Sequence, residues 1–204
     1  MTKAKERNQL YPIFLKMDKL KVLIVGGGFV ACEKLHFILK SSPNANLTVM
    51  APEIRPEILE LFSTTDHQIS LIHQPFDPSI LSNFDIAIAA TNIAELNFEV
   101  YHTAKEAGLI VNVADTPQLC DFYMGSIVTR GNLKVAISTN GKSPTFAKRF
   151  RELLEDILPE EVDDLLHQLK AVRDGLEMDF EEKVEYLNDL TKSMVDQTDS
   201  VAKN

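Results

Sequence analysis

Short apolar, β-branched runs alternate with helix-like periodicities through the first half of the chain. Glycine, proline, serine or asparagine bounds most of these runs, as is typical of buried parallel strands. We expect strands at residues 22–25, 47–50, 69–72, 85–90 and 109–113. Helices are expected at residues 30–39, 56–62 and 94–107, with a helical turn at 78–81. This alternation predicts an α/β protein with a Rossmann-type parallel sheet covered on both faces.

The pattern changes after residue 115. Two apolar runs, 126–129 and 133–138, flank a Gly131-Asn132 turn and predict a small β-hairpin. A long helix then begins at Pro144, and helical periodicity continues to a charged, frayed tail, with breaks near residues 158–159 and 175. We therefore expect three parts: a Rossmann domain at 1–115, a hairpin region at 116–145 and a C-terminal helical module at 146–204.

A glycine-rich turn follows the first expected strand. The spacing Gly26-x-Gly28-x-x-Ala31 fits the dinucleotide-binding fingerprint, and it lies between a strand and a helix as that fingerprint requires. Glycine at the second position lets the backbone approach a pyrophosphate, and the helix N-terminus offers N–H groups to the phosphates. The turn predicts a bound dinucleotide.

Residues after two other strands are candidates for the same site, because ligands bind outside the carboxyl ends of such strands. Thr91 and Asn92 follow the fourth strand, where they would reach the cofactor, cap the next helix, or both. An acid for the ribose hydroxyls is expected after the second strand, and Glu53 lies one or two residues late. No arginine sits at that strand end, although Arg55 is close, so NAD is favoured over NADP.

Asp115 follows the fifth strand and would point at the cleft where a substrate meets the nicotinamide. It is a candidate general base or metal ligand, and a turn aspartate before Thr116-Pro117 is the alternative. Near the long helix, Lys142, Lys148, Arg149 and Arg151 gather beside Gly141. They form either an anion-binding group or an ordinary solvated helix face.

Composition excludes several classes of partner. A formal net charge of −9 argues against nucleic acid, and no apolar run approaches the ~20 residues needed to cross a bilayer. The cysteines, Cys32 and Cys120, fit two buried thiols better than a disulfide framework or a metal site, and we expect a cytoplasmic protein. The five histidines show no metal-ligand spacing, so no stable metal site is expected.

Several motifs together resemble the precorrin-2 dehydrogenase and sirohydrochlorin ferrochelatase family of sirohaem biosynthesis. The resemblance covers about three quarters of the chain, and its most distinctive parts are the NVAD and ISTNGKSP segments. The matching segments are YPIFL at 11–15, VGGGFVA at 25–31 with Lys34, APE at 51–53, AATN at 89–92, NVAD at 112–115, LCDF at 119–122 and VAISTNGKSP at 135–144.

The resemblance implies NAD-dependent oxidation of precorrin-2 to sirohydrochlorin, and in some members insertion of Fe²⁺ at the same site. It implies a homodimer with the hairpin as dimerisation region, and it makes Asp115 the catalytic residue and a transient Fe²⁺ ligand. The cofactor site would comprise Gly26, Gly27, Gly28, Phe29, Val30, Ala51, Pro52, Glu53, Thr91 and Asn92. The tetrapyrrole site would comprise Ser138, Thr139, Asn140, Gly141, Lys142, Lys148 and Arg149.

Two other functions stay open. One is a non-catalytic NAD sensor whose helical tail signals to a partner, although a sensor would not need Asp115 and the GKSP segment. The other is an NAD-dependent dehydrogenase of a different polyanionic substrate. The spectrum of the tetrapyrrole during turnover distinguishes these readings.

Overall fold

The computed structural model describes residues 7–64 and 67–192. Within it the chain forms two compact units. The first comprises residues 1–125 and Ser138–Pro144, and the second comprises Ser126–Ile137 and residues 145–204. The charged tail expected at the end of the chain falls on residues 193–204 and lies outside the described residues.

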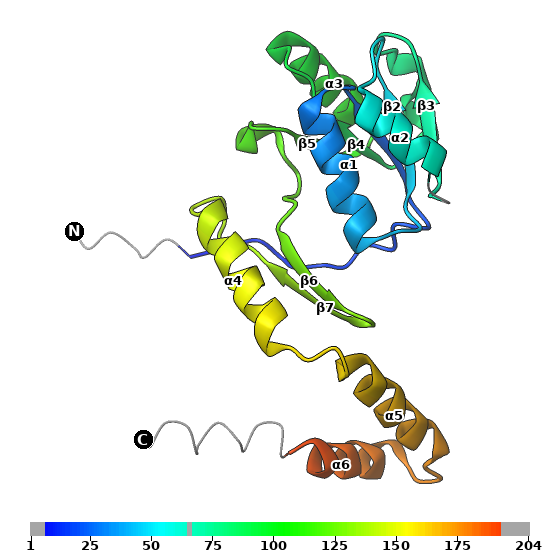
Figure 1. Ribbon diagram of the computed structural model, residues 1–204, viewed down its shortest axis with the longest axis vertical. Helices are drawn as coiled ribbons and strands as arrows, with labels where there is room; N and C mark the ends of the chain where they lie inside the picture. The colour runs from blue at the N-terminus through cyan, green and yellow to red at the C-terminus, as the bar shows by residue number, and fades with distance from the viewer. Residues whose placement is uncertain (1–6, 65–66, 193–204) are drawn as a thin grey trace, which may run out of the picture. The chain divides into compact units, whose positions relative to one another are not determined.

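The first unit is built on a five-stranded parallel sheet in the order β3-β2-β1-β4-β5 (Figure 1). The strands are β1 (Lys21–Val25), β2 (Asn46–Met50), β3 (Ile69–Ile72), β4 (Ile86–Ala89) and β5 (Ile110–Val113). The helices are α1 (Phe29–Ser41), α2 (Pro56–Thr64) and α3 (Ala94–Glu106), with 3₁₀ segments η1 (Pro78–Asn83) and η2 (Pro117–Leu119). The Rossmann-type fold expected from the sequence is confirmed.

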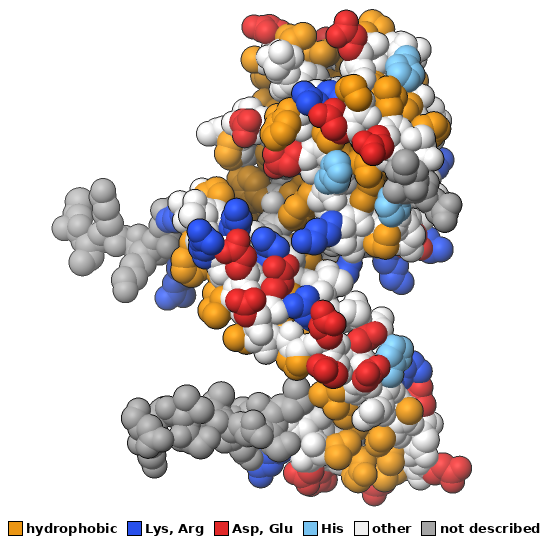
Figure 2. All heavy atoms as spheres, viewed as in Figure 1, with side chains coloured by type: hydrophobic (Ala, Val, Ile, Leu, Met, Phe, Trp, Pro, Cys, Tyr) orange, Lys and Arg blue, Asp and Glu red, His pale blue; other side chains and the backbone are white. Residues whose placement is uncertain are grey.

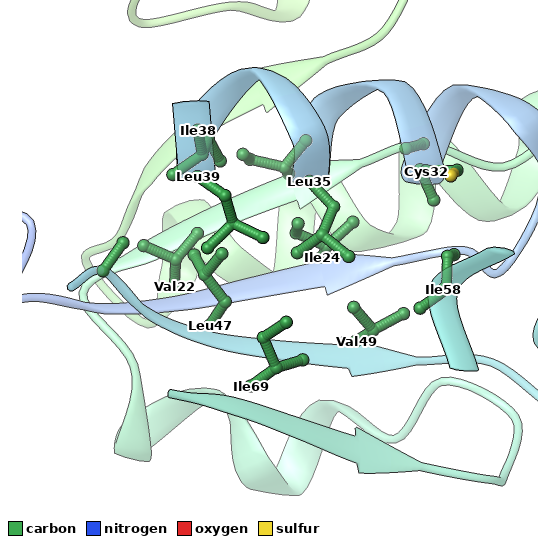
Figure 3. Close-up of a cluster of buried hydrophobic side chains, with 14 of the residues drawn as sticks. Val22, Ile24, Cys32, Leu35, Ile38, Leu39, Leu47, Val49, Ile58 and Ile69 are labelled. Atoms are coloured by element: carbon green, nitrogen blue, oxygen red, sulfur yellow. The ribbon is translucent and has the colours of Figure 1, made fainter. Parts of the chain in front are cut away.

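Alternate residues of the central strand serve two separate cores. Val22 and Ile24 of β1 pack in a cluster with residues of α1 and α2, which Figure 3 shows. Leu23 and Val25 point to the opposite face, into a cluster with residues of α3 and η1. Both faces of the sheet are therefore covered, which explains why the strands read as continuous apolar runs.

The second unit contains an antiparallel hairpin and three helices. Its elements are β6 (Ser126–Arg130), β7 (Leu133–Ile137), α4 (Pro144–Ile157), α5 (Val162–Gly175) and α6 (Phe180–Thr191). Arg130 of the hairpin donates to the carbonyl oxygens of Glu155 and Leu158 at the end of α4. Asp163 in the first turn of α5 accepts from the backbone N–H and the side-chain amide of Asn132, at 2.7 and 2.8 Å. Polar contacts thus connect the hairpin to two helices.

The element boundaries agree closely with the sequence analysis. The third strand has the expected bounds, α1 runs two residues further than the expected helix, and the breaks near 158 and 175 coincide with the ends of α4 and α5. Gly108, with φ +81°, follows the C-cap residue Ala107 of α3. The division into three parts stays a prediction. Within the described residues, none of the helices combines the length and the apolar character needed to cross a membrane.

Candidate functional site

The carboxyl ends of the parallel strands bring most of the expected site residues to one edge of the sheet. Val25 of β1 is in register with Met50 of β2 and Ala89 of β4, and Ala89 is in register with Val113 of β5. The loops that follow these four strands therefore start at the same edge. They contain the glycine turn, residues 51–53, Thr91 with Asn92, and Asp115.

The three positions of the first loop are occupied by glycine for different structural reasons. Gly26 has φ +125°, and a Cβ there would lie 2.4 Å from the carbonyl oxygen of Ala90. A Cβ on Gly27 would lie 2.1 Å from the carbonyl oxygen of Glu53. A Cβ on Gly28 would meet no heavy atom within 4 Å, and its backbone is extended. The protein itself requires the first two glycines, whereas the third leaves a gap beside the backbone, as a bound pyrophosphate requires.

The same turn leads directly into α1. Gly28 is its N-cap, and the N–H of Cys32 donates to the carbonyl oxygen of Gly28 at 3.1 Å. The N–H groups of Phe29, Val30 and Ala31 precede that first helical bond, so the fold gives them no partner in the helix. No acidic residue lies in this first turn. The N-terminus of α1 is thus suited to a phosphate group.

The loop after β2 contacts the glycine turn through its backbone. The N–H of Arg55 donates to the carbonyl oxygen of Gly27 at 2.9 Å, while Pro52 and Glu53 are exposed. The guanidinium of Arg55 is paired with Glu57 at 2.6 Å, which raises the pKa of Arg55 and lowers that of Glu57. The arginine that follows residues 51–53 in the sequence is therefore engaged with a carboxylate of its own chain.

Asn97 of α3 holds the loop after β4, a role the sequence analysis missed. Its side-chain oxygen accepts from the N–H and the hydroxyl of Thr91 at 3.2 and 2.8 Å, and its amide donates to the carbonyl oxygen of Thr91 at 3.0 Å. Asn97 is buried, whereas Asn92 is exposed. The Thr91 hydroxyl thus has a structural task at the start of α3, and Asn92 is the more accessible of the two. No pattern in the sequence marks this role, because it depends on which backbone groups the loop leaves without partners.

Asp115 occupies a tight turn directly after β5. Its φ is +57°, a left-handed conformation that aspartate tolerates better than most residues, and the N–H of Thr116 donates to the carbonyl oxygen of Val113 at 3.3 Å. The residue is exposed, and no side chain or backbone group of the described residues bonds or pairs with its carboxylate. This carboxylate is therefore available to accept a proton or approach a ligand.

The segment after η2 contacts the outer edge of β5. The Asp121 carboxylate accepts from the N–H of Val111 at 2.8 Å and pairs with Lys105 at 2.8 Å. The Cys120 thiol contacts the backbone of Val113 and Thr116. Burial raises the pKa of this thiol, so it remains protonated at neutral pH. Cys120, which we expected to be a buried thiol, is half-buried and contacts the Asp115 turn.

The expected tetrapyrrole residues divide between the two units. Residues 138–142 form a turn in the first unit, in which the N–H of Lys142 donates to the carbonyl oxygen of Thr139 at 3.1 Å. Asn140 and Gly141 are both left-handed, with φ +54° and +74°. Lys148 and Arg149 lie exposed on α4 in the second unit, and Arg149 pairs with Glu152 at 2.7 Å. The substrate roles of all these residues stay predictions.

Metal-ligating side chains do not gather in the described part of the chain. Over residues 7–64 and 67–192 there is no group of three or more histidine, cysteine, aspartate or glutamate residues placed to hold a metal ion. The Cys32 thiol lies 3.4 Å from Nδ1 of its helical neighbour His36. The described residues therefore do not form an enclosed metal centre.

Curated relatives match most of this chain, although it forms only part of each of them. "Siroheme synthase" of Psychrobacter arcticus is 40% identical over 150 residues, which are 74% of this chain and 27% of that protein. "Siroheme synthase" of Pseudoalteromonas translucida is 36% identical over 172 residues, 84% of this chain and 36% of that protein. The chain thus spans about a quarter to a third of the length of the curated relatives it matches.

A solved structure and two family models agree with these relatives. The structure titled "SirC, precorrin-2 dehydrogenase" superposes with a TM-score of 0.70 at 28% identity and covers 89% of both chains. The model described as "Sirohaem biosynthesis protein central" matches residues 130–157, and the model described as "Putative NAD(P)-binding" matches residues 13–126. Because the latter covers more than half of the 204 residues, the chain belongs to this NAD(P)-binding family, as a member that also carries the central segment of sirohaem biosynthesis proteins.

Proposed function

We propose that this chain oxidises precorrin-2 to sirohydrochlorin with NAD⁺ as the hydride acceptor. One observation carries the proposal: an open glycine turn and an unpaired carboxylate follow β1 and β5 at the same edge of one sheet. A cofactor loop and a proton acceptor at one edge are what a dehydrogenase needs. The likeness to the structure titled "SirC, precorrin-2 dehydrogenase" supports this substrate.

The cofactor site fits a dinucleotide on the chain's own geometry. The open space beside Gly28 admits a pyrophosphate, and the first-turn N–H groups of α1 would hold its oxygens. The ribose and adenine would lie along residues 51–53. Arg55, which follows residues 51–53 in the sequence, already pairs with Glu57, which supports NAD rather than NADP. When bound, the nicotinamide supplies the hydride acceptor.

Asp115 completes the redox balance as the proton acceptor. Oxidation of precorrin-2 removes two electrons and one hydrogen nucleus as hydride and releases a second hydrogen as a proton. The Asp115 carboxylate takes that proton directly or through one water molecule, because nothing else among the described residues engages it. The remaining task of the chain is to hold the two ring systems together.

Polar and cationic residues of each unit, taken separately, are proposed to bind carboxylates of the tetrapyrrole. Residues 138–142 offer hydroxyl and backbone groups, and Lys148 of α4 is exposed with no ion pair among the described residues. Arg149 is already paired with Glu152, so Lys148 is the better first candidate of the two. Such local cations are compatible with a chain whose formal net charge is −9.

Insertion of Fe²⁺ into sirohydrochlorin is a second candidate activity. It is supported by the curated relatives named "Siroheme synthase" and by the unpaired, exposed Asp115 carboxylate. An oxygen ligand that is free of other bonds would meet the incoming ion transiently and accept a pyrrole proton. Iron is a substrate in this reaction.

A homodimer is proposed, with the apolar surface of α4 as a candidate interface in addition to the hairpin region that the sequence led us to expect. Phe146, Phe150, Leu153 and Ile157 recur at one face of this helix and are 59, 39, 51 and 61% exposed. The rings of Phe146 and Phe150 stack at 5.9 Å. An exposed apolar stripe of this length is typical of a protein interface.

The cytoplasm is proposed as the compartment, because its reducing conditions keep thiols such as those of Cys32 and Cys120 free.

An anaerobic assay with NAD⁺ and precorrin-2 tests the function. We expect NADH absorbance to rise together with the sirohydrochlorin spectrum, and addition of Fe²⁺ to produce sirohaem if the second activity is present. NAD⁺ binding without NADH formation would favour the sensor. NADH formation with another polyanion but not with precorrin-2 would favour a different dehydrogenase.

A further inference from the structure

Cys120 lies where the outer edge of β5 would otherwise have unpaired backbone groups. β5 is the last strand of the sheet, so its outward N–H and carbonyl groups have no neighbouring strand. Asp121 covers Val111, since its carboxylate accepts from the Val111 N–H and its own N–H donates to the Val111 carbonyl oxygen, both at 2.8 Å. Two residues further along β5, the outward N–H and carbonyl groups of Val113 are covered by the Cys120 thiol.

The Cys120 sulfur contacts both ends of the turn that carries Asp115. It accepts from the Val113 N–H at 3.3 Å, and the carbonyl oxygens of Val113 and Thr116 lie 3.2 and 3.4 Å from it. Asn112 also donates to the sulfur at 3.5 Å, and to the carbonyl oxygen of Phe122 at 2.8 Å. The thiol is therefore held in place by the strand that it covers.

We infer that Cys120 is a positioning residue that holds Asp115 in its left-handed turn. The conformation of Asp115, at φ +57°, is uncommon for a residue with a side chain and needs surrounding contacts to persist. The backbone hydrogen bond across the turn is long, at 3.3 Å, so the thiol supplies a second connection between Val113 and Thr116. The catalytic consequence rests on the proposed function, but the contact itself does not.

Amide hydrogen exchange tests the contact without any substrate. In Cys120→Ala we expect the Val113 and Thr116 amides to exchange about tenfold faster, with the Ile24 amide in the sheet centre unchanged. Cys32→Ala is the matched control, because it removes the other thiol from α1. Equal exchange at Val113 in wild type and Cys120→Ala would overturn the inference, whatever the enzyme's activity.

Kinetics test the consequence for Asp115. We expect Cys120→Ala to lower kcat about tenfold with KM for NAD⁺ little changed, and Cys120→Ser to recover most of the loss because its hydroxyl also donates. Cys32→Ala should retain wild-type kcat. A kcat of Cys120→Ala equal to that of Cys32→Ala, in an active wild-type enzyme, would refute positioning. An inactive wild type would instead refute the proposed function, while the exchange measurement would still decide the contact.

Discussion

The two units of this chain are stabilised in different ways. Almost all fully buried apolar side chains of the described residues lie in the first unit, and only Val128 and Ala147 lie in the second. The second unit is connected by polar contacts of Arg130 and Asp163 and exposes large apolar side chains on its helices, some of which Figure 2 shows over α5 and α6. The first unit thus has a core of its own, whereas the second leaves many large apolar side chains exposed.

The same difference extends to function. Every residue proposed to hold NAD⁺ or take the proton belongs to the first unit, where strand register determines its place. Lys148, Arg149 and the apolar stripe of α4 belong to the second. Substitutions in the first unit should therefore change the rate of the chemical step or the affinity for NAD⁺. Those in the second unit should change assembly or the affinity for the substrate.

Asp115→Ala gives the largest expected effect and should separate chemistry from binding. Loss of the proton acceptor is expected to lower kcat about a thousandfold. NAD⁺ affinity should not change, because no hydrogen bond or ion pair joins the Asp115 side chain to the glycine turn among the described residues. Steady-state NADH formation and calorimetric titration of NAD⁺ measure the two quantities. Unchanged sirohydrochlorin formation would remove Asp115 from the mechanism.

Gly28→Val should weaken NAD⁺ binding about a hundredfold in a folded protein. The side chain would enter the space proposed for the pyrophosphate, since a Cβ at this position would meet no heavy atom within 4 Å beyond its chain neighbours. Titration of NAD⁺ measures the affinity, and the melting temperature measures folding.

Two other glycines control for this change. Gly175→Val also places a side chain in open space, but in the second unit, and should retain affinity. Gly26→Ala should instead destabilise the fold, because its Cβ would meet the Ala90 carbonyl oxygen. Wild-type affinity in Gly28→Val would place the cofactor elsewhere.

Phe150→Asp should separate the subunits of the proposed homodimer and leave the first unit intact. A charge in the middle of the apolar stripe of α4 is expected to raise the dimer dissociation constant at least about thirtyfold. Analytical ultracentrifugation measures it, and NAD⁺ titration should show unchanged affinity. Asp156→Ala, which changes an exposed residue of α4 outside the stripe, is the control. A dimer of equal stability in Phe150→Asp would exclude this surface as the interface.

Asp163→Ala gives the smallest expected effect, a local loosening of the hairpin turn. The two hydrogen bonds from Asn132 lower the pKa of the Asp163 carboxyl. Their stabilising effect is therefore fully present at pH values above the ordinary pKa of an aspartate. The effect is then lost as the pH falls through the lowered pKa. Exchange of the Asn132 amide should be faster in Asp163→Ala at neutral pH, and wild type should approach it only in acid. In Asp164→Ala the Asn132 amide should exchange as in wild type, both at neutral pH and in acid.

How far the sequence predicts this molecule also differs between the units. Strands such as Ile69–Ile72 follow from apolar runs, and the breaks after Ile157 and at Gly175 follow from proline and glycine. The roles of Asn97 and Cys120 could not be read in the same way, because they depend on which backbone groups a loop leaves unpaired. Helix α6 was expected only as part of a longer helical region. Amphipathic periodicity predicts that such a region is helical, but it does not predict which surface covers the exposed helix.

A single-turnover reaction measures the central claim most directly. The wild-type protein would be saturated with NAD⁺ and mixed anaerobically with less than one equivalent of precorrin-2, while NADH and tetrapyrrole absorbance are followed together. The account predicts one NADH for each sirohydrochlorin formed, at a common rate. Sirohydrochlorin formed without NADH, or neither product formed although NAD⁺ is bound, would contradict hydride transfer at this edge of the sheet.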